Sequence, residues 1–434
     1  MARIAIIGGT GEFGRLFARV FAGDGYEVVI TGRDERKGRR VAAEAGVEYM
    51  RDNRAAAAGA DVVILSVPIE KTVEVAEEVA PEVREGSLLT DFTSVKVEPC
   101  RAMLEHAREG VEVVGMHPMF GPRVASLEGM VFILTPLRTG RWWEWLQGWL
   151  HRHRARVVVT TPEEHDRMMS VVQGMTHFTY ISAASTLREL GVDVRETRRF
   201  ASPIYELMLD LIARIVGQNP HLYASIQLHN PFARQVRQSF VESALRLKEV
   251  LDSGRREEFV RIMADAARHM GDVSSAMGRS DKAIAALRHE FRRLQRSMGR
   301  EVALRHIYSG AVHVGVVEEV EPESVTLRCG RRRVRLKLAN VELLPESEVL
   351  RIKAQRLPHE SRDFSVLLPE HASPQVIAGL VEGVRGVLEC RVLEEYRGEG
   401  IPEGMKSVLF RVRGVEVDFG EVERLLVGIG GRLR

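Results

Sequence analysis

Cysteine is scarce in this chain of 434 residues, and its three cysteines stand far apart. Cys100, Cys329 and Cys390 form no C-x-x-C pair, which excludes a disulfide framework and a zinc site and fits a reducing cytoplasm. No apolar run reaches the roughly 18 residues that span a bilayer, and no signal-peptide pattern opens the chain. The formal charge of +2 gives no general attraction to nucleic acid or membranes. These absences predict a cytoplasmic, soluble protein without a bound metal.

Alternating strand and helix patterns fill residues 1–160. Apolar runs of strand length are separated by segments in which apolar residues such as Phe13, Phe17 and Phe21 recur at helical spacing. This alternation predicts an α/β domain with a parallel, doubly wound sheet. The expected strands cover residues 3–7, 26–31, 62–67, 88–91, 111–116, 130–135 and 156–160.

The pattern changes at Thr161, because Thr161-Pro162-Glu163-Glu164 has the form of a capping box at a helix start. Residues 161–300 then carry stripes too apolar for lone surface helices, which predicts an all-α domain shared between two subunits. Residues 301–358 alternate as strands and predict a small β-rich connecting module. Residues 359–434 follow the strand and helix order of a ferredoxin-like α+β unit, and this order is similar to that of an ACT-type ligand-sensing module.

A glycine-rich turn follows the first expected strand directly and opens a helix. Its form is Gly9-x-Gly11-x-x-Gly14, in which the glycines permit a tight turn, approach to a pyrophosphate and close helix packing. The helix N-terminus offers free amides to phosphates. An ordinary glycine-rich turn is the alternative, but the strand and helix context predicts a dinucleotide-binding Rossmann domain. The residues expected to contact the cofactor here are Gly9, Thr10, Gly11, Glu12, Phe13 and Gly14.

The end of the second expected strand bears on the choice of cofactor. An NAD site expects an acidic residue there, whereas this chain has Thr31-Gly32-Arg33-Asp34. Arg33 can pair with the 2′-phosphate of NADP, and Thr31 can hydrogen-bond it. The alternative is that Arg33 is a solvated loop residue and that Asp34 binds ribose. We therefore expect NADP, with NAD as the alternative.

Several further segments resemble the prephenate dehydrogenase family in their order and spacing. They are DFTSVK at 91–96, GMHPMFGP at 115–122, EHD at 164–166, QGMTHF at 173–178 and SPIY at 202–205, followed by Arg214 and Asn219-Pro220. The likeness covers residues 1–285. It implies oxidative decarboxylation of prephenate to 4-hydroxyphenylpyruvate in tyrosine biosynthesis, with hydride transfer to NADP or NAD.

That reaction needs a base near the ring hydroxyl and cations near two carboxylates. His117 is the expected base, because an imidazole accepts a proton at neutral pH and because His117 stands just past an expected strand end; a turn-capping histidine is the alternative. The resemblance gives His117 the same catalytic role. It also implies that Ser94 hydrogen-bonds this histidine or the nicotinamide region. Lys96 is expected either to support an anion or to lie in solvent.

Three residues are the further candidates for substrate binding. Arg214 lies among apolar residues of a helix and is expected to be buried, where it needs a partner such as a carboxylate. The resemblance implies that it binds the ring carboxylate; an internal ion pair with Asp210 is the alternative. His177 matches a substrate-binding histidine of the family. Arg123 follows the HPMFGP motif, where it would repel the ammonium group of arogenate and so favour prephenate; solvent or the NADP phosphate are its other expected surroundings.

The C-terminal third adds a regulatory hypothesis. An ACT-like module suggests tyrosine as an effector, from architecture alone. The basic run Arg331-Arg332-Arg333-x-Arg335-x-Lys337 is interpreted as the solvated face of a strand, not as a nucleic-acid site, because no aromatic residues are interleaved with the charges. We expect a homodimer. Arogenate dehydrogenase and a non-catalytic sensor of NADP or amino acids are the alternative functions.

Overall fold

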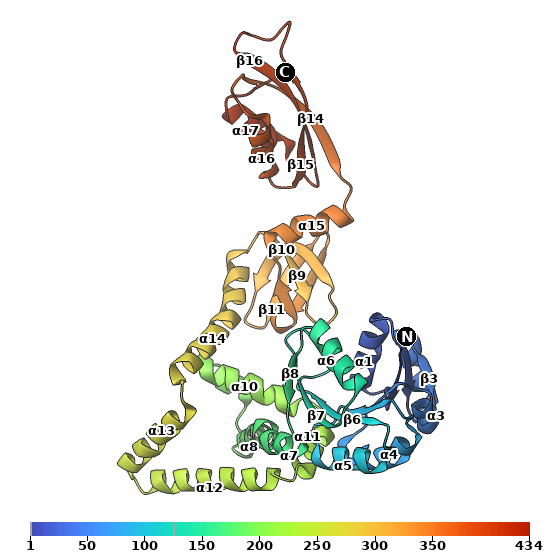
Figure 1. Cartoon of the computed structure of the whole chain (residues 1–434). Helices are drawn as coiled ribbons and strands as arrows, with labels where there is room; N and C mark the ends of the chain where they lie inside the picture. Colours follow the sequence, from blue (N-terminus) through green and yellow to red (C-terminus); the bar gives the residue numbers. More distant parts are fainter. Residues whose placement is uncertain (1, 125) are drawn as a thin grey trace. The chain divides into compact units, whose positions relative to one another are not determined.

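The computed structural model describes residues 2–124 and 126–434. The chain forms two compact units, unit 1 of residues 1–275 and unit 2 of residues 276–434 (Figure 1). Within the described residues, no helix combines the length and the apolarity that crossing a membrane requires.

Unit 1 begins with an eight-stranded sheet of order β3-β2-β1-β4-β5-β6-β7-β8. Its strands are β1 (Arg3–Ile7), β2 (Glu27–Thr31), β3 (Glu48–Met50), β4 (Val62–Leu65), β5 (Leu88–Asp91), β6 (Glu112–Pro118), β7 (Val131–Arg138) and β8 (Arg156–Val159). The expected parallel pairing holds from β3 to β6. It is wrong at β7, which runs antiparallel to β6, with Met116 opposite Leu134. The described residues of the connection 119–130 contain no helix that could return the chain to the other end of the sheet.

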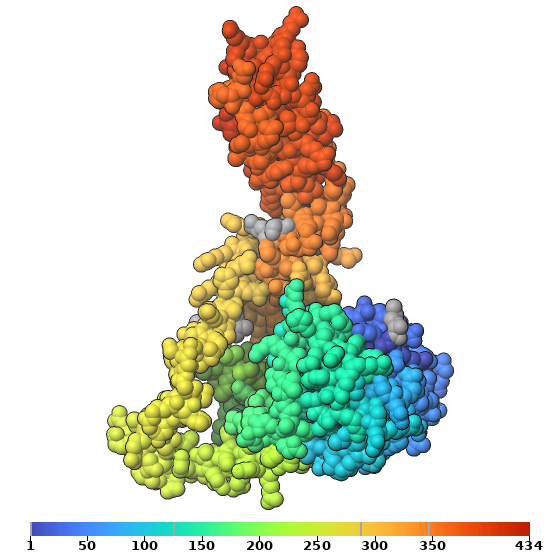
Figure 2. All heavy atoms as spheres, viewed as in Figure 1, coloured from blue at the N-terminus to red at the C-terminus, as the bar shows by residue number. Residues whose placement is uncertain are grey.

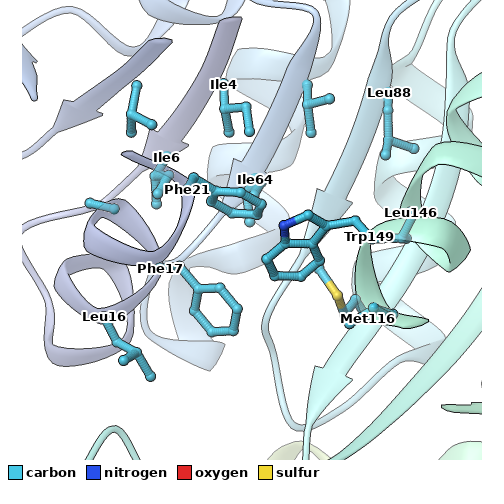
Figure 3. Packing of buried hydrophobic residues seen from close by; sticks show 14 of the residues in the cluster. Ile4, Ile6, Leu16, Phe17, Phe21, Ile64, Leu88, Met116, Leu146 and Trp149 are labelled. Carbon is cyan, nitrogen blue, oxygen red and sulfur yellow. The ribbon is translucent and has the colours of Figure 1, made fainter. Parts of the chain in front are cut away.

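Helices cover both faces of this sheet. They are α1 (Glu12–Gly23), α2 (Glu35–Ala45), α3 (Asn53–Ala58), α4 (Ile69–Val79) with a 3₁₀ turn (Ala80–Glu82), α5 (Val97–His106) and α6 (Arg141–Arg152). On one face, Phe17 and Phe21 of α1 pack with Trp149 of α6, and the Phe21 and Trp149 ring centroids lie 4.6 Å apart (Figure 3). All four tryptophans of the chain lie on α6. A second buried cluster fills the other face, under α3, α4 and α5.

The rest of unit 1 is helical. Its elements are α7 (Pro162–Met169), a π-helical turn (Ser170–Met175), α8 (Thr176–Glu189), α9 (Val194–Arg198), α10 (Pro203–Val216), α11 (Pro220–His229), α12 (Ala233–Asp252) and α13 (Arg256–Met270). Thr161 caps α7 as expected, since its hydroxyl accepts a hydrogen bond from the Glu164 amide at 3.2 Å. The other half of the expected capping box is absent, because the Glu164 carboxylate pairs with Arg167. Neither α8 nor α13 buries a residue, and Figure 2 shows α13 at the open edge of the unit.

Helix α14 (Val273–Arg296) leads into unit 2, which contains two antiparallel sheets. The first has the order β12-β11-β10-β9-β13, with β9 (Glu301–His306), β10 (Val312–Val320), β11 (Ser324–Cys329), β12 (Arg332–Lys337), a 3₁₀ turn (Leu338–Asn340) and β13 (Val341–Leu343). The basic run lies on the edge strand β12, as interpreted, and Arg333 and Arg335 pair with Glu318 and Glu321.

After α15 (Glu346–Arg356), the chain forms the second sheet of unit 2. Its elements are β14 (Glu360–Pro369), α16 (Pro374–Glu382), β15 (Val387–Tyr396), β16 (Met405–Gly414), α17 (Phe419–Gly428) and β17 (Arg432–Leu433), with the sheet order β15-β16-β14-β17. Both helices pack on one face, where Val366, Val408 and Phe410 are buried. The ferredoxin-like order of strands and helices that the sequence predicted is therefore confirmed.

Candidate active site

The glycine loop is packed so closely that side chains are excluded at two of its three signature positions. A Cβ atom on Gly9 would lie 2.7 Å from the Ile30 side chain, and one on Gly14 would collide with the Gly9 backbone. At Gly11, in contrast, the one described atom near such a Cβ is the Gly8 carbonyl oxygen, at 3.5 Å. Gly9 and Gly14 therefore serve packing, and Gly11 leaves the backbone open to a ligand.

The N-terminus of α1 suits the phosphates of a dinucleotide. Gly11 is the N-cap of α1 and supplies no side-chain acceptor to the amides of the first turn, which includes Glu12 and Phe13. These amides and the positive end of the helix dipole attract an anion. Thr10 packs against the place that a Cβ of Gly32 would occupy. The open backbone and uncapped helix end fit the pyrophosphate of NAD or NADP, which the loop from Gly9 to Gly14 would hold.

The residues expected to select the cofactor differ in their exposure to solvent. Thr31 is fully buried, and its hydroxyl accepts a hydrogen bond from the Gly8 amide at 3.0 Å and donates one to Asn53 at 2.7 Å. The expectation that Thr31 binds the 2′-phosphate is therefore wrong, because its hydrogen-bonding capacity stabilises the loop. Arg33 is exposed. Asp34 caps α2, because its carboxylate accepts a hydrogen bond from the Lys37 amide at 3.0 Å. One oxygen of this carboxylate is therefore already engaged, and the other is left for the alternative role of binding ribose.

A chain of buried polar side chains joins the end of β6 to the start of α7. His117 Nδ1 lies 2.9 Å from His165 Nε2, and His165 Nδ1 lies 2.7 Å from Asp166 Oδ1. Asp166 is held in turn by the backbone amides of Lys96, at 2.7 Å, and Val97, at 2.9 Å. All three relay residues are nearly inaccessible to solvent. We call His117, His165 and Asp166 the histidine relay.

The order of partners in the histidine relay defines where its protons lie. The Asp166 carboxylate accepts, so His165 Nδ1 carries a proton and, in a neutral ring, Nε2 does not. His117 Nδ1 must then donate to that nitrogen, and His117 Nε2 keeps its lone pair. Burial, with contributions from His165 and Lys96, holds the pKa of His117 well below its usual range. Burial also lowers the pKa of His165, opposed by the hydrogen bond to Asp166. The relay therefore presents an unprotonated imidazole nitrogen.

Lys96 supports an anion, which was one of its two expected roles, but that anion is the carboxylate of Asp91. Its side chain is fully buried, and its ammonium group is hydrogen-bonded to Asp91 and, at 3.2 Å, to Thr93 Oγ1. Burial raises the pKa of the Asp91 carboxyl, and the ammonium group opposes that shift. Gly115 leaves room for this pair, since a Cβ there would lie 2.9 Å from Lys96 Cδ. Substrate binding by Lys96, like solvent exposure, is therefore wrong, and Lys96 is an internal cation behind the relay.

The π-helical turn and α8 bring a second group of polar atoms toward His117. Gln173 Nε2 lies 3.4 Å from His117 Nε2. One helical turn further, the His177 ring packs against Tyr223 of α11 in a tilted contact, with an interplanar angle of 60° and ring centroids 4.3 Å apart. Burial lowers the pKa of His177 to about 4. Gln173 Oε1 and His177 Nδ1 are buried without a partner in the described part of the chain, and each such atom costs about 1–3 kcal/mol until a ligand satisfies it.

Arg214 belongs to this second group, although not as a buried residue. It is exposed on α10, so the expectation of a buried arginine is wrong. The alternative pair with Asp210 is also wrong, because Asp210 accepts a hydrogen bond from Arg198 at 3.0 Å. The charge of Arg214 lowers the pKa of Tyr223, against the larger upward effect of burial. Arg214 therefore lies near Tyr223, whose ring packs against His177, and solvent reaches its guanidinium group.

Arg123 and Ser94 are the other two residues that the sequence assigned to the substrate and catalytic sites. Arg123 lines a hollow of about 210 Å³ together with Glu12, Arg15 and Arg19 of α1 and Val41, Glu44 and Ala45 of α2. The structure therefore places Arg123 along the helix that follows the glycine loop. Ser94 is half-buried in the bend between β5 and α5. Its hydroxyl makes no hydrogen bond to the described residues.

Four residues of the site were not assigned from the sequence, namely His165, Asp166, Gln173 and Tyr223. A signal existed for three of them, because EHD and QGMTHF are among the segments that carry the family resemblance. The helix cap at Thr161 puts His165 in the first turn of α7, and Gln173 precedes His177 by four residues. Within the described residues, no group of three or more His, Cys, Asp and Glu side chains is placed to hold a metal ion.

A glycine loop at the end of β1, an imidazole base at the end of β6 and a helical second part define an NAD(P)-dependent dehydrogenase of the Rossmann type. The family models agree with this class. The model of the prephenate dehydrogenase nucleotide-binding domain matches residues 17–159, and that of the prephenate dehydrogenase dimerization domain matches residues 161–265. The chain belongs to the prephenate dehydrogenase family.

Similar proteins extend this result to unit 2. A probable arogenate/prephenate dehydrogenase of Methanocaldococcus jannaschii is 41% identical over 440 residues, which cover 99% of this chain and 98% of that protein. A 4-amino-4-deoxyprephenate dehydrogenase of Streptomyces pristinaespiralis is 32% identical over 64% of this chain and 94% of its own length. The solved structure of prephenate dehydrogenase from Aquifex aeolicus, with hydroxyphenyl propionate and NAD⁺, covers 63% of this chain and 98% of that chain, with 22% identity and a TM-score of 0.52. This structural likeness shows the same fold.

Proposed function

We propose that the protein oxidises prephenate to 4-hydroxyphenylpyruvate with loss of carbon dioxide, in the biosynthesis of tyrosine. The observation that carries this proposal is the histidine relay, which presents the lone pair of His117 Nε2 at the end of β6. Strands β1, β4, β5 and β6 are mutually parallel, so the base and the glycine loop share the carboxyl edge of the sheet, where such sheets bind their ligands.

The chemistry follows from this arrangement. His117 Nε2 takes the proton of the ring hydroxyl as the hydride leaves the carbon that bears this hydroxyl. A bound oxidised nicotinamide supplies the hydride acceptor. The bond between the ring and its carboxylate then breaks, its electron pair completes the aromatic ring, and carbon dioxide leaves. The proton returns from His117 to the new phenolate oxygen, so the relay ends as it began.

Arg214 and His177 are the proposed holders of the substrate. Prephenate has two carboxylates, and the planar guanidinium group of an arginine binds a carboxylate with two parallel hydrogen bonds. Arg214 is exposed and close to Tyr223, whose ring packs against His177. The unpartnered Nδ1 of His177 is an adjacent polar atom that a bound substrate would satisfy. We assign the ring carboxylate to Arg214.

For the cofactor we propose NADP as the preferred form. The exposed Arg33 at the end of β2 supports this preference, and Asp34 is partly engaged as the cap of α2. Arg33→Ala is expected to raise the Michaelis constant for NADP about tenfold, the effect of losing one charge-assisted phosphate contact. The constant for NAD should stay unchanged in the same initial-rate assay. A lower constant for NAD than for NADP in the unsubstituted enzyme would contradict the preference.

A second substrate, arogenate, is favoured by one observation. The Methanocaldococcus jannaschii relative, which matches both units, is named for arogenate as well as prephenate. Arg123, which was expected to repel the ammonium group of arogenate, lines the hollow beside α1 and α2. We keep prephenate as the proposed substrate because the family models that match the chain are named for it alone.

The helical part of unit 1 is the proposed contact with a second copy of the chain. Apolar side chains stand exposed there, including Ile204 at 74% and Met263 at 67% exposure. Stripes of this kind are ordinarily covered by another helix. The name of the matched dimerization-domain model supports the same assignment. A monomeric mass by light scattering across a range of concentrations would contradict it.

We also propose that the ferredoxin-like part of unit 2 is an ACT-like module that binds tyrosine as an effector. Its strand and helix order supports this hypothesis. Added tyrosine should lower the initial rate of the full chain and raise its melting temperature. If tyrosine changes neither quantity, this part of the proposal is wrong.

One spectrophotometric experiment tests the main proposal. The purified chain is mixed with NADP and prephenate, and the absorbance of NADPH is followed. We expect its formation together with 4-hydroxyphenylpyruvate and carbon dioxide in equal amounts. The same assay with arogenate and with NAD ranks the substrates and cofactors. If neither prephenate nor arogenate supports NADPH or NADH formation, the dehydrogenase function is excluded.

A further inference from the structure

The π-helical turn Ser170–Met175 is the least regular part of the site. It interrupts an otherwise continuous run of helix between α7 and α8. Such turns widen one helical turn by a residue, so they change the direction of the side chains that they carry, and they recur at functional sites. Here the turn carries Gln173.

Neighbouring side chains brace this turn from outside. The Gly174 carbonyl oxygen accepts a hydrogen bond from Gln227 Nε2 of α11 at 2.7 Å. Arg237 of α12 in turn donates to Gln227 Oε1 at 2.9 Å and to its carbonyl oxygen at 2.8 Å. The position of Gln173 is therefore fixed by contacts that do not involve its own side chain, and the side chain is left to act on His117.

The side-chain amide of Gln173 faces the base with its donor end. Because His117 Nε2 carries the lone pair in the histidine relay, its neighbour at 3.4 Å must donate, and Gln173 Nε2 is that donor. The other end of the amide, Gln173 Oε1, is buried and has no partner among the described residues. A glutamine with a purely structural role would have both ends satisfied.

We propose that Gln173 is a further catalytic residue of the reaction under Proposed function, on which this inference rests. In the free enzyme its amide N–H covers the lone pair of His117 Nε2. Bound substrate separates the two, and the N–H turns to the ring oxygen while His117 takes the proton from that oxygen. Gln173 thereby stabilises the negative charge that develops on the oxygen as the hydride leaves.

The proton and electron balance limits what Gln173 does. The hydroxyl proton passes to His117 Nε2, the hydride passes to the nicotinamide, and the carbon–oxygen bond becomes double. Gln173 neither gains nor loses a proton, so its contribution is a hydrogen bond that is stronger in the transition state than in the ground state. Its loss should therefore lower kcat and leave KM nearly unchanged.

Two substitutions at this position and one matched control test the proposal. Gln173→Met keeps the length of the side chain but removes both hydrogen-bonding groups. Gln173→Glu keeps the size and puts a carboxylate beside the base. Gln147→Met makes the same change as the first variant on the exposed surface of α6, away from the relay.

In steady-state assays, we expect kcat of Gln173→Met to fall about 10²-fold, in the range found for the loss of one oxyanion donor. Its KM for prephenate should stay within about threefold, and Gln147→Met should match the unsubstituted enzyme. Gln173→Glu should move the acid limb of the kcat/KM profile to higher pH, because a neighbouring carboxylate raises the pKa of an imidazole. A purely structural role of Gln173 would not lower kcat at constant KM, and it would not shift the acid limb of the kcat/KM profile.

A second measurement does not require turnover. Carbethoxylation of His117, followed by mass spectrometry of its peptide, reports the unprotonated imidazole as a function of pH. We expect faster modification in Gln173→Met, where the lone pair is uncovered, and a midpoint at higher pH in Gln173→Glu. If Gln173→Met melts at a lower temperature than the control, the pH shifts of Gln173→Glu, in kcat/KM and in carbethoxylation, test the proposal in its place.

The two proposals fail in different ways. An unsubstituted enzyme that does not oxidise prephenate or arogenate overturns the proposed function, whatever the carbethoxylation rates show. An active enzyme in which Gln173→Met behaves like Gln147→Met, or in which Gln173→Glu leaves both pH midpoints in place, overturns the role of Gln173. Unchanged carbethoxylation in both variants excludes the contact with His117 even in an inactive protein.

Discussion

The candidate active site has two sides, which differ in how fully their polar groups find hydrogen-bond partners within a single chain. On the sheet side, His117, His165 and Asp166 are buried and bonded to one another. On the helical side, Arg214 is exposed, and a buried nitrogen of His177 has no partner in the described part of the chain. In the proposed reaction, the proton-transfer machinery is thus complete before a ligand arrives, while the proposed binding side is left open. Substitutions in the histidine relay should lower kcat, and substitutions of Arg214 or His177 should raise KM.

The largest effect is expected from the end of the histidine relay. His117→Asn should lower kcat about 10³-fold, because general-base catalysis contributes about 10²–10⁴-fold and asparagine cannot take the proton. The formation of NADPH at saturating prephenate measures it. His151→Asn on the exposed surface of α6 is the control and should retain full activity. A His117→Asn enzyme with a kcat within about tenfold of normal would show that the base lies elsewhere.

The next effect tests whether the relay works as one chain. Asp166→Asn should lower kcat about 10²-fold, since an amide no longer selects the tautomer of His165 that leaves His117 Nε2 unprotonated. Asp193→Asn makes the same change at the exposed cap of α9 and should leave kcat unchanged. Rates at saturating substrate separate the two variants. Equal kcat values in both would mean that Asp166 merely anchors the backbone of Lys96.

On the binding side, Arg214→Gln should raise KM for prephenate at least tenfold and change kcat little. The loss of a charge-assisted hydrogen bond, about 1.5–3 kcal/mol, corresponds to this range. The melting temperature should not change, because the side chain is exposed. Arg188→Gln on α8, also exposed, is the control. A fall in kcat at constant KM would place Arg214 with the proton-transfer machinery and break the contrast between the two sides.

The smallest effect concerns stability and pH. Burial lowers the pKa of His117, His165 and His177, the last to about 4. Below about pH 6.5, the ordinary value for histidine, the unfolded chain binds protons that these folded residues refuse. Stability is therefore full above that pH and is lost as the pH falls toward 4. Urea unfolding across this range measures the loss, which His177→Gln should reduce. A variant with the same pH slope as the unsubstituted chain would contradict the assignment.

The sequence predicted the elements of the sheet better than their pairing. Seven strands were expected near their observed bounds, because each is an apolar run between turn residues. The short strand β3 has too few residues for a periodic signal. The antiparallel direction of β7 depends on how the connection 119–130 leaves β6, which no local pattern in either strand records. The ferredoxin-like order was predictable because its strands and helices have distinct periods.

The site was predictable residue by residue only where the family motif named a role. His117 and the glycine loop lie at strand ends, where chain position and residue type together indicate function. Thr31 ends β2 and Lys96 precedes α5 in the loop after β5, but contacts with Asn53 and Asp91 occupy their polar groups. The helical stripe that suggested a buried Arg214 cannot show which part of an apolar helix is covered.

Because every tryptophan lies on α6, tryptophan fluorescence reports on one part of the chain. Indole emission arises wholly from the nucleotide-binding half of unit 1, next to Phe21, while the helical part and unit 2 are silent at red-edge excitation. Because indole emission overlaps the absorption of reduced nicotinamide, energy transfer can report bound NADH or NADPH without a label. During thermal unfolding, indole emission reports the unfolding of this half alone. Circular dichroism recorded in parallel would then reveal whether the rest of the chain melts with it.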